Sequence, residues 1–84
     1  MRLLYRPNGL EVSRLLITLR KKFGTAVERN RARRLVKEAY RHLKSDIQCG
    51  YDIGCVVYQK GLSYTETVRI LDSLIRKAGL YEDA

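Results

Sequence analysis

The sequence predicts an α+β fold, a two-layer sandwich whose elements follow the order strand, strand, helix, strand, helix (β-β-α-β-α). Two apolar runs flank a turn signal, a third such run lies further along the chain, and two stretches with helical periodicity account for most of the rest. With 84 residues the chain is expected to form a single domain, residues 1–84. A domain of this size has a thin core and little room for a deep pocket with a supported catalytic shell.

The predicted strands lie at residues 2–6, 12–19 and 51–58. Between the first two, Pro7-Asn8-Gly9 is a strong turn signal, and two strands around a short turn predict an antiparallel hairpin. The third strand carries apolar residues on both faces, which is typical of an interior strand. Those residues are Ile53, Cys55 and Val57 on one face and Gly54, Val56 and Tyr58 on the other.

The first helix is predicted from about Ala26 to about Lys44. Thr25 precedes it as N-cap, and Glu28 follows three residues later, which is the spacing of a capping box. Apolar residues recur along it with the 3.6-residue period and form one stripe, made of Ala32, Leu35, Val36, Ala39, Tyr40 and Leu43. The opposite side of this helix is strongly basic.

A second capping box, at Ser63 and Glu66, predicts the start of the last helix, and Gly79 fits its C-terminal end. The apolar spacing leads us to expect that this helix buries Tyr64, Val68, Leu71, Ile75 and Ala78.

The charge is concentrated in one segment. The chain has 17 Lys and Arg against 9 Asp and Glu, a formal net charge of +8. Residues 20–44 hold ten of the bases and only two of the acids, whereas bases and acids balance elsewhere. Such a cluster repels itself unless something negative meets it, so the expected partner is a polyanion.

The arginines of the first helix stand where they cost stability. Arg29, Arg31, Arg33 and Arg34 fall near its N-terminus, where cations oppose the helix macrodipole. Arginine offers planar, two-pronged hydrogen bonding to phosphate oxygens, and free N–H groups at a helix start also favour phosphate. We interpret the pattern as stability given up for anion binding.

Several classes of protein are excluded or disfavoured. No apolar run approaches the roughly 18–20 residues that span a bilayer, and the N-terminus does not resemble a secretory signal. Cys49 and Cys55 cannot form a disulfide framework and have no His partners at zinc spacing, so a reduced, cytoplasmic location is expected, with no metal bound by the protein alone. His42 has no partner at catalytic spacing, and no residue is predicted to be catalytic.

One stretch of the sequence says more about the protein family than the overall composition does. Residues 21–35 (KKFGTAVERNRARRL) resemble the signature of the bacterial ribonuclease P protein component, in which a Lys-Lys-x-Gly-x-Ala-Val-x-Arg-Asn run opens the central helix. The similarity extends over roughly residues 3–81, through Tyr51-Asp52-Ile53 and residues 62–66 (LSYTE). It implies a fold like the second domain of ribosomal protein S5, with a left-handed crossover around the basic helix. It also implies that this chain lacks the family's N-terminal helix and first strand.

The resemblance further implies a function. Family members bind the catalytic RNA of ribonuclease P and the 5′ leader of precursor tRNA, and they assist endonucleolytic removal of that leader. The RNA carries the chemistry, so magnesium is expected through the RNA complex, and neither a membrane nor an obligate protein partner is implied. The positions that would contact RNA are Lys21, Lys22, Arg29, Asn30, Arg31, Arg33, Arg34, Lys37 and Arg41. Tyr5, as a stacking platform for an unpaired base, and Arg20 would contact the leader.

Alternatives remain open at this point. The same charge pattern suits a generic RNA- or ribosome-binding module with no role in cleavage. A membrane-surface protein is disfavoured because the apolar stripe of the basic helix includes two alanines, Ala32 and Ala39. Phe23, beside Gly24, is either a lid on the core or a contact at the RNA surface.

Overall fold

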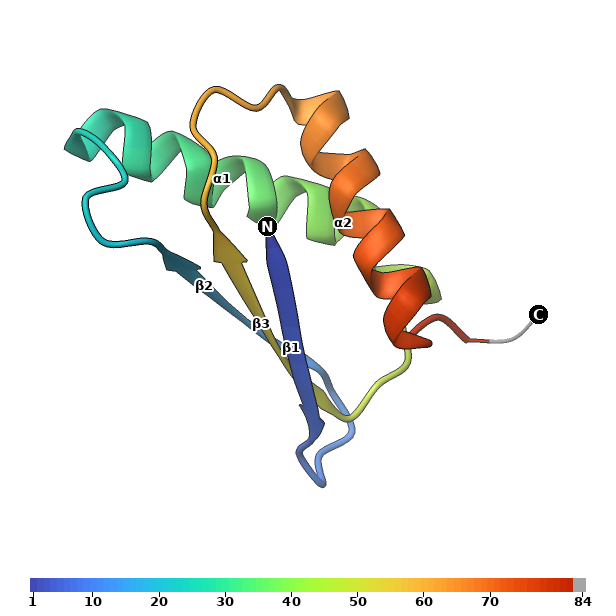
Figure 1. Cartoon of the computed structure of the whole chain (residues 1–84). Coiled ribbons are helices and arrows are strands. Elements are labelled where there is room, and N and C mark those ends of the chain that lie inside the picture. The colour runs from blue at the N-terminus through green and yellow to red at the C-terminus, as the bar shows by residue number, and fades with distance from the viewer. Residues whose placement is uncertain (83–84) are drawn as a thin grey trace.

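In the computed structural model, which describes residues 1–82, three strands and two long helices follow the predicted order (Figure 1). The elements are β1 (Arg2–Pro7), β2 (Arg14–Leu19), α1 (Ala26–Leu43), the short 3-10 turn η1 (Lys44–Asp46), β3 (Tyr51–Val57) and α2 (Tyr64–Ala78). The expected strand at residues 12–19 begins only at Arg14, because Val12 and Ser13 belong to the preceding loop.

The sheet has the order β1-β3-β2, so β3 is the interior strand, as predicted. It pairs antiparallel with β1 and parallel with β2. The predicted β1–β2 hairpin is therefore wrong: β3 lies between the two strands. The loop from Asn8 to Ser13 is long enough to cross one strand, because neighbouring strands lie only about 4.8 Å apart.

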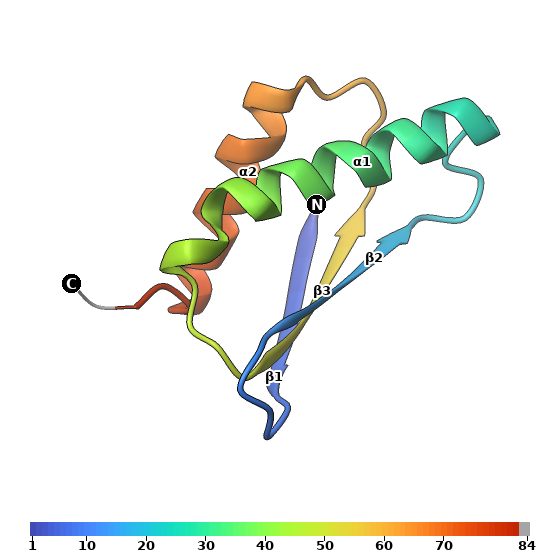
Figure 2. The same ribbon diagram turned by 180° about the vertical axis from the view of Figure 1, so that it is seen from behind.

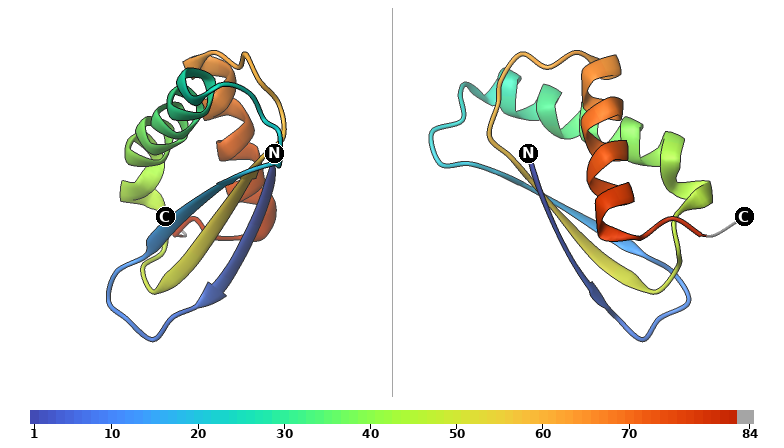
Figure 3. Two further views of the ribbon diagram at one scale, coloured as in Figure 1. Left: turned by 90° about the vertical axis from the view of Figure 1, so that its left-hand side faces the viewer. Right: turned by 45° about the vertical axis from the view of Figure 1, so that its right-hand side comes forward.

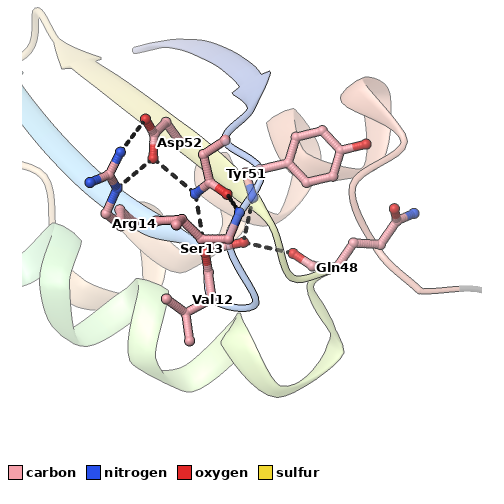
Figure 4. A network of polar contacts seen from close by, with 8 residues as sticks. Val12, Ser13, Arg14, Gln48, Tyr51 and Asp52 are labelled. Carbon is pink, nitrogen blue, oxygen red and sulfur yellow. Dashed lines mark hydrogen bonds and ion pairs between the residues drawn. The ribbon is translucent and has the colours of Figure 1, made fainter.

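Side chains of that loop hold the start of β3 in place (Figure 4). The Ser13 hydroxyl donates to the Gln48 carbonyl at 2.8 Å and accepts from the Tyr51 N–H at 3.1 Å. The Asn8 amide donates to Asp52 at 3.0 Å, and the Asn8 backbone N–H donates to the Gly50 carbonyl at 2.8 Å. These hydrogen bonds join the loop to the start of β3, and β3 therefore lies between β1 and β2.

Both helices cover the same face of the sheet (Figure 3). Figure 2 views the molecule with α1 in front; β2 and β3 both point upward, and β3 lies to the left of β2. The β2–α1–β3 crossover is therefore left-handed, against the right-handed connection found in about 98% of such units. The left-handed crossover implied by the resemblance is present.

The core lies between the helices and one face of the sheet. Ile53, Cys55 and Val57 alternate along β3 and are buried. The helices meet them with Val36 and Ala39 from α1 and with Thr67, Leu71 and Ile75 from α2.

One expected core residue is misplaced. Tyr64 is 40% exposed, because the first turn of α2 extends beyond the ends of the strands (Figure 1). Thr67 is buried one turn later, in line with Leu71 and Ile75, and its hydroxyl donates to the Ser63 carbonyl at 2.8 Å. A threonine can occupy this apolar position because its one polar group is satisfied within the helix.

Candidate nucleic-acid interface

The loop from Arg20 to Thr25 is fixed by an aromatic side chain. Phe23 is 1% exposed and belongs to the core cluster, so it is a lid on the core and not a surface contact. With Phe23 turned inward, the neighbouring Lys21 and Lys22 are exposed. Lys22 has φ +63°, a left-handed conformation that a lysine adopts only where the surrounding structure compensates for the strain.

The capping box at the start of α1 leaves little room for a side chain at the residue before Thr25. A Cβ on Gly24 would lie 2.8 Å from a carboxylate oxygen of Glu28, the acid of the capping box. That oxygen accepts from the Thr25 N–H at 3.0 Å, while the Thr25 hydroxyl accepts from the Glu28 N–H at 3.2 Å. The hydrogen bonds with Thr25, helped by the Lys60 ammonium 3.7 Å away, lower the pKa of Glu28. The cap thus holds the only acid of the first turn away from the arginines that follow.

The outward side of α1 is a continuous cationic surface, which we call the basic face. Its arginine and lysine side chains recur at helical spacing on the side opposite Val36 and Ala39. Its exposed members are Asn30, Arg34, Lys37 and Arg41. Arg31 is also exposed but lies at the edge of the apolar stripe, where it lines a hollow with Leu35 and Val36. Arg29 and Arg33 are half-buried. Arg33 lies on the flank between the basic face and the apolar stripe, whereas Arg29 lies in line with Val36, two turns before it.

The cations of the basic face have no carboxylate partner within residues 1–82. The ion pairs in this part of the chain are Arg14–Asp52 at 2.7 Å, Lys60–Glu28 at 3.7 Å and Arg76–Asp72 at 3.2 Å. None of them involves Lys21, Lys22 or a cation of α1. The guanidinium groups are therefore available to an external anion, and the helix N-terminus adds its own N–H groups and positive dipole end.

The structure separates the two residues expected to contact a leader. Tyr5 pairs with Ile53 and so faces the helix side of the sheet, where it is 48% exposed and its ring lies edge-on to Tyr51 with centroids 6.3 Å apart. Arg20 follows Arg14, Leu16 and Thr18 in the alternation of β2, whose side chains point to the opposite face. The two side chains belong to different faces, so one flat cleft does not include both.

Sequence reasoning missed the polar cluster at the start of β2. Arg14 makes a two-pronged ion pair with Asp52, at 2.7 and 2.8 Å (Figure 4). The Asn8 amide donates to the same carboxylate at 3.0 Å. Hydrogen bonds from Arg14 and then Asn8 lower the pKa of Asp52 to about 2. Nothing in the local sequence indicates this contact, because Arg14 and Asp52 are brought together only by the register of parallel strands.

Other chemistries find no support in this part of the chain. No three His, Cys, Asp or Glu side chains among residues 1–82 are grouped so that they could hold a metal ion. No described helix has the length and apolar character to cross a bilayer. Both cysteines are free thiols.

Comparisons with known proteins agree with the geometry. A family model described as Ribonuclease P matches residues 1–79. The ribonuclease P protein component of Caldanaerobacter subterraneus subsp. tengcongensis is 37% identical over 81 residues, which cover 94% of this chain and 70% of the relative. That of Clostridium kluyveri is 41% identical over 80 residues, covering 89% of this chain and 70% of the relative.

Solved structures point the same way. The RNase P protein from Thermotoga maritima superposes with a TM-score of 0.72 at 32% identity, over 88% of this chain and 74% of that chain. The Staphylococcus aureus RNase P protein superposes with a TM-score of 0.78 at 23% identity, over 95% of this chain and 75% of that chain, which supports the fold alone. Sequence and architecture thus agree on one family.

Proposed function

The chain belongs to the bacterial ribonuclease P protein family, and on this premise we propose that its basic face binds the catalytic RNA. As a protein component of ribonuclease P it takes part in maturation of tRNA 5′ ends together with the RNA. The observation that carries the proposal is the set of α1 cations that have no ion-pair partner within residues 1–82, preceded by the exposed Lys21 and Lys22. A rigid helix presents these groups at fixed spacing, which suits a folded sugar-phosphate backbone.

Each contact has a separate role in this proposal. Arg31, Arg34 and Arg41 are exposed and bond phosphate oxygens directly. The half-buried Arg29 and Arg33 are restrained by their surroundings, so they lose less conformational entropy when they bind. Asn30 carries no charge and offers a donor and an acceptor to a base edge or a ribose hydroxyl.

The sheet would hold the substrate. In this proposal Tyr5 stacks on an unpaired base of the 5′ leader of precursor tRNA, and Arg20 contacts a leader phosphate. The protein supplies binding and orientation and no catalytic side chain. Magnesium ions would act through the RNA, because the chemistry of phosphoryl transfer needs charge neutralisation that the RNA can position.

Reconstitution with a bacterial ribonuclease P RNA tests the proposal. Cleavage of precursor tRNA at low magnesium is expected to be faster with the chain than with the RNA alone, since its cations replace part of the screening otherwise supplied by metal ions. Binding of precursor tRNA is expected to exceed that of mature tRNA. No gain over the bare RNA, or binding indifferent to a 5′ extension, would instead assign the chain to a generic RNA-binding role.

A further inference from the structure

A hollow of about 100 Å³ opens at one end of the core, on the side of the sheet that the helices cover. It lies where the loop between β3 and α2, residues 58–63, passes beside the first half of α1 (Figure 1, Figure 2). The Lys60 ammonium of this loop lies 3.7 Å from the Glu28 carboxylate of α1. The two segments therefore meet at the mouth of the hollow.

The lining of the hollow is apolar below its mouth. Phe23, Val36 and Val57 form its floor and are each at most 2% exposed. Leu35 and Leu62 form walls; they are half-buried, and within residues 1–82 they do not pack against the core cluster. The apolar stripe of α1 thus extends past the core at Leu35, where the described part of the chain leaves it uncovered.

The floor offers little to hold water, because a bound water needs two to four polar partners. The Thr67 hydroxyl lies there, but it already donates to the Ser63 carbonyl at 2.8 Å. No buried side-chain nitrogen or oxygen within residues 1–82 lacks a partner. A closed apolar cavity of about 150 Å³ holds a benzene ring. This smaller hollow, open on one side, has room for the edge of one flat ring.

The mouth of the hollow adds a positive charge. Glu28 and Lys60 offset each other, and Glu28 is also held by the Thr25 N–H at 3.0 Å. Arg31 lines the same hollow, is exposed and makes no ion pair within residues 1–82. A ligand that enters ring first would therefore place an anionic group beside the Arg31 guanidinium. A nucleotide combines a flat ring with such a group, and arginine bonds phosphate oxygens in two-pronged fashion.

Arg31 also connects the hollow to the basic face. Residues three and four apart are neighbours on a helix surface, so Arg31 lies between Arg34 on the basic face and Leu35 on the wall of the hollow. An RNA strand whose phosphates follow the basic face therefore reaches the mouth of the hollow without leaving α1. We propose that the hollow receives one unpaired base of the catalytic RNA, whose phosphate is bound by Arg31. The proposal rests on the proposed function and adds a base-binding pocket to it.

Such a pocket would set the register of the RNA on α1. Phosphate contacts orient a protein on a nucleic acid but carry no sequence information. Unpaired bases in loops and bulges are the usual targets of specific RNA recognition, because they can be turned out of the stack. One base held in the hollow would fix which phosphates meet the basic face.

The decisive variant is Ala32→Leu, which fills the hollow from its wall. Leucine is a good helix former and adds apolar burial, so the thermal midpoint is expected to stay the same or rise. The Kd for ribonuclease P RNA is expected to rise about 5- to 30-fold, the range for loss of one bound base. Because no charge is removed, the slope of log K against log salt should not change. Loss of the fold or of the basic face does not produce this combination.

Ala78→Leu is the matched control, since Ala78 is a half-buried alanine of α2 that does not line the hollow. Its Kd for the RNA should equal that of the wild-type chain. If Ala32→Leu does not fold, Leu62→Gln replaces it, because Leu62 does not pack against the core cluster. That substitution keeps size and charge but makes one wall polar, and it is expected to weaken binding about 3- to 10-fold.

Chemical probing of the RNA bases gives a direct readout. With the wild-type chain and with Ala78→Leu, one unpaired base of the catalytic RNA should be protected from modification. With Ala32→Leu or Leu62→Gln that base should react again, while protection of the sugar-phosphate backbone along α1 remains.

The failures are distinguishable. Equal Kd values and equal base protection for the wild-type chain, Ala32→Leu and Leu62→Gln overturn the inference and leave the proposed function intact. A salt slope flattened by Ala32→Leu also overturns the inference, because it would mean that the basic face itself was disturbed. A chain that never binds the RNA or accelerates cleavage overturns the proposed function first.

A second copy of the chain is a weaker candidate for the hollow. Each chain carries a formal net charge of +8, and a symmetric contact would bring Arg31 and Lys60 of both copies together. Like charges at an interface oppose association. Sedimentation that shows a dimer of the free chain, lost in Leu62→Gln, would assign the hollow to a second copy and overturn the inference.

Discussion

The two helices begin in the same way and differ in how their charges are used. Thr25 with Glu28 and Ser63 with Glu66 form complete capping boxes, and both helices send an apolar stripe to the same core. In α2 the cations Arg76 and Lys77 stand in the last turn, where they complement the macrodipole. In α1 the arginines begin within two turns of the N-terminus, where they oppose it.

The partners of these charges differ as well. Asp72 of α2 accepts a hydrogen bond from the Tyr81 hydroxyl and another from Arg76 at 3.2 Å. These bonds, chiefly the one from Tyr81, lower the pKa of Asp72. The Arg76 guanidinium also lies 5.2 Å from the centre of the Tyr81 ring. The cations of α1 have no such internal partners among the described residues. Arg76 of α2 thus supports the fold, whereas the cations of α1 are left without an ion pair within residues 1–82, as the proposed RNA contact requires.

Truncating the core side of α2 should give the largest effect. Ile75 is fully buried, so Ile75→Ala is expected to lower the free energy of unfolding by about 2–5 kcal/mol, through lost burial and a residual cavity. Chemical denaturation followed by circular dichroism measures the change. The affinity of the folded fraction for ribonuclease P RNA should be unchanged. A large loss of affinity without loss of stability would contradict a purely structural role for α2.

Removing charge from α1 should do the reverse of Ile75→Ala: it should weaken RNA binding and leave the stability of the fold nearly unchanged. Arg33→Ala with Arg34→Ala is expected to weaken binding of the catalytic RNA about 10- to 100-fold and to flatten the plot of log K against log salt by about one to two units. Stability should be nearly unchanged, because alanine is a good helix former and neither arginine makes an ion pair within residues 1–82. Filter binding at several salt concentrations provides the measurement.

Arg69→Ala with Lys77→Ala is the matched control on α2, since it removes the same charge from exposed positions of the other helix. We expect no change in the salt slope for this pair. Equal slopes for the two double variants would mean that RNA senses only the net charge and that the basic face is not the binding surface.

Removing the N-caps of the two helices should have the smallest effects on stability and should compare α1 and α2 most directly. Thr25→Ala and Ser63→Ala are each expected to cost about 1 kcal/mol of stability, because each leaves helix N–H groups without an acceptor. Only Thr25→Ala should also weaken RNA binding, since fraying of α1 displaces its first arginines. Thermal unfolding and RNA binding of both variants test this, and equal RNA affinity would show that the start of α1 is not in the interface.

The same caps predict a dependence on pH. The capping hydrogen bonds lower the pKa of Glu28 and of Glu66 below the ordinary value of 4.5. Their contribution is therefore complete above about pH 4.5 and is lost as the pH falls through the lowered pKa of the folded state. Glu28→Gln and Glu66→Gln should each flatten the acid limb of the stability profile.

Much of the local structure was predictable because it depends on neighbours in sequence. The capping boxes, the stripe of α1, the interior position of β3 and the end of α2 at Gly79 are confirmed. The concentration of charge in residues 20–44 predicted a basic face on α1 from the sequence alone, since helical periodicity places many of those side chains on the side opposite the apolar stripe. The Lys-Lys-x-Gly run likewise indicated the family that the comparisons show.

Contacts between distant segments were not predictable. The turn at Pro7-Asn8-Gly9 indicated a reversal of the chain but not which strand would lie beside β1. The spacing of apolar residues in α2 gave no sign that its first turn lies beyond the sheet, so Tyr64 was expected inside and Thr67 was overlooked. For Phe23, only the assembled core decided between an inward and an outward position.

Amino-acid order alone determined where helices begin, which of their sides are apolar and where positive charge accumulates, because these properties arise within a few residues along the chain. Tertiary structure decided that β3 separates β1 from β2, that Tyr5 and Arg20 point to opposite faces, and that Arg14 meets Asp52. Strand register sets these relations, and register is chosen by burial of one whole face of the sheet rather than by any local signal.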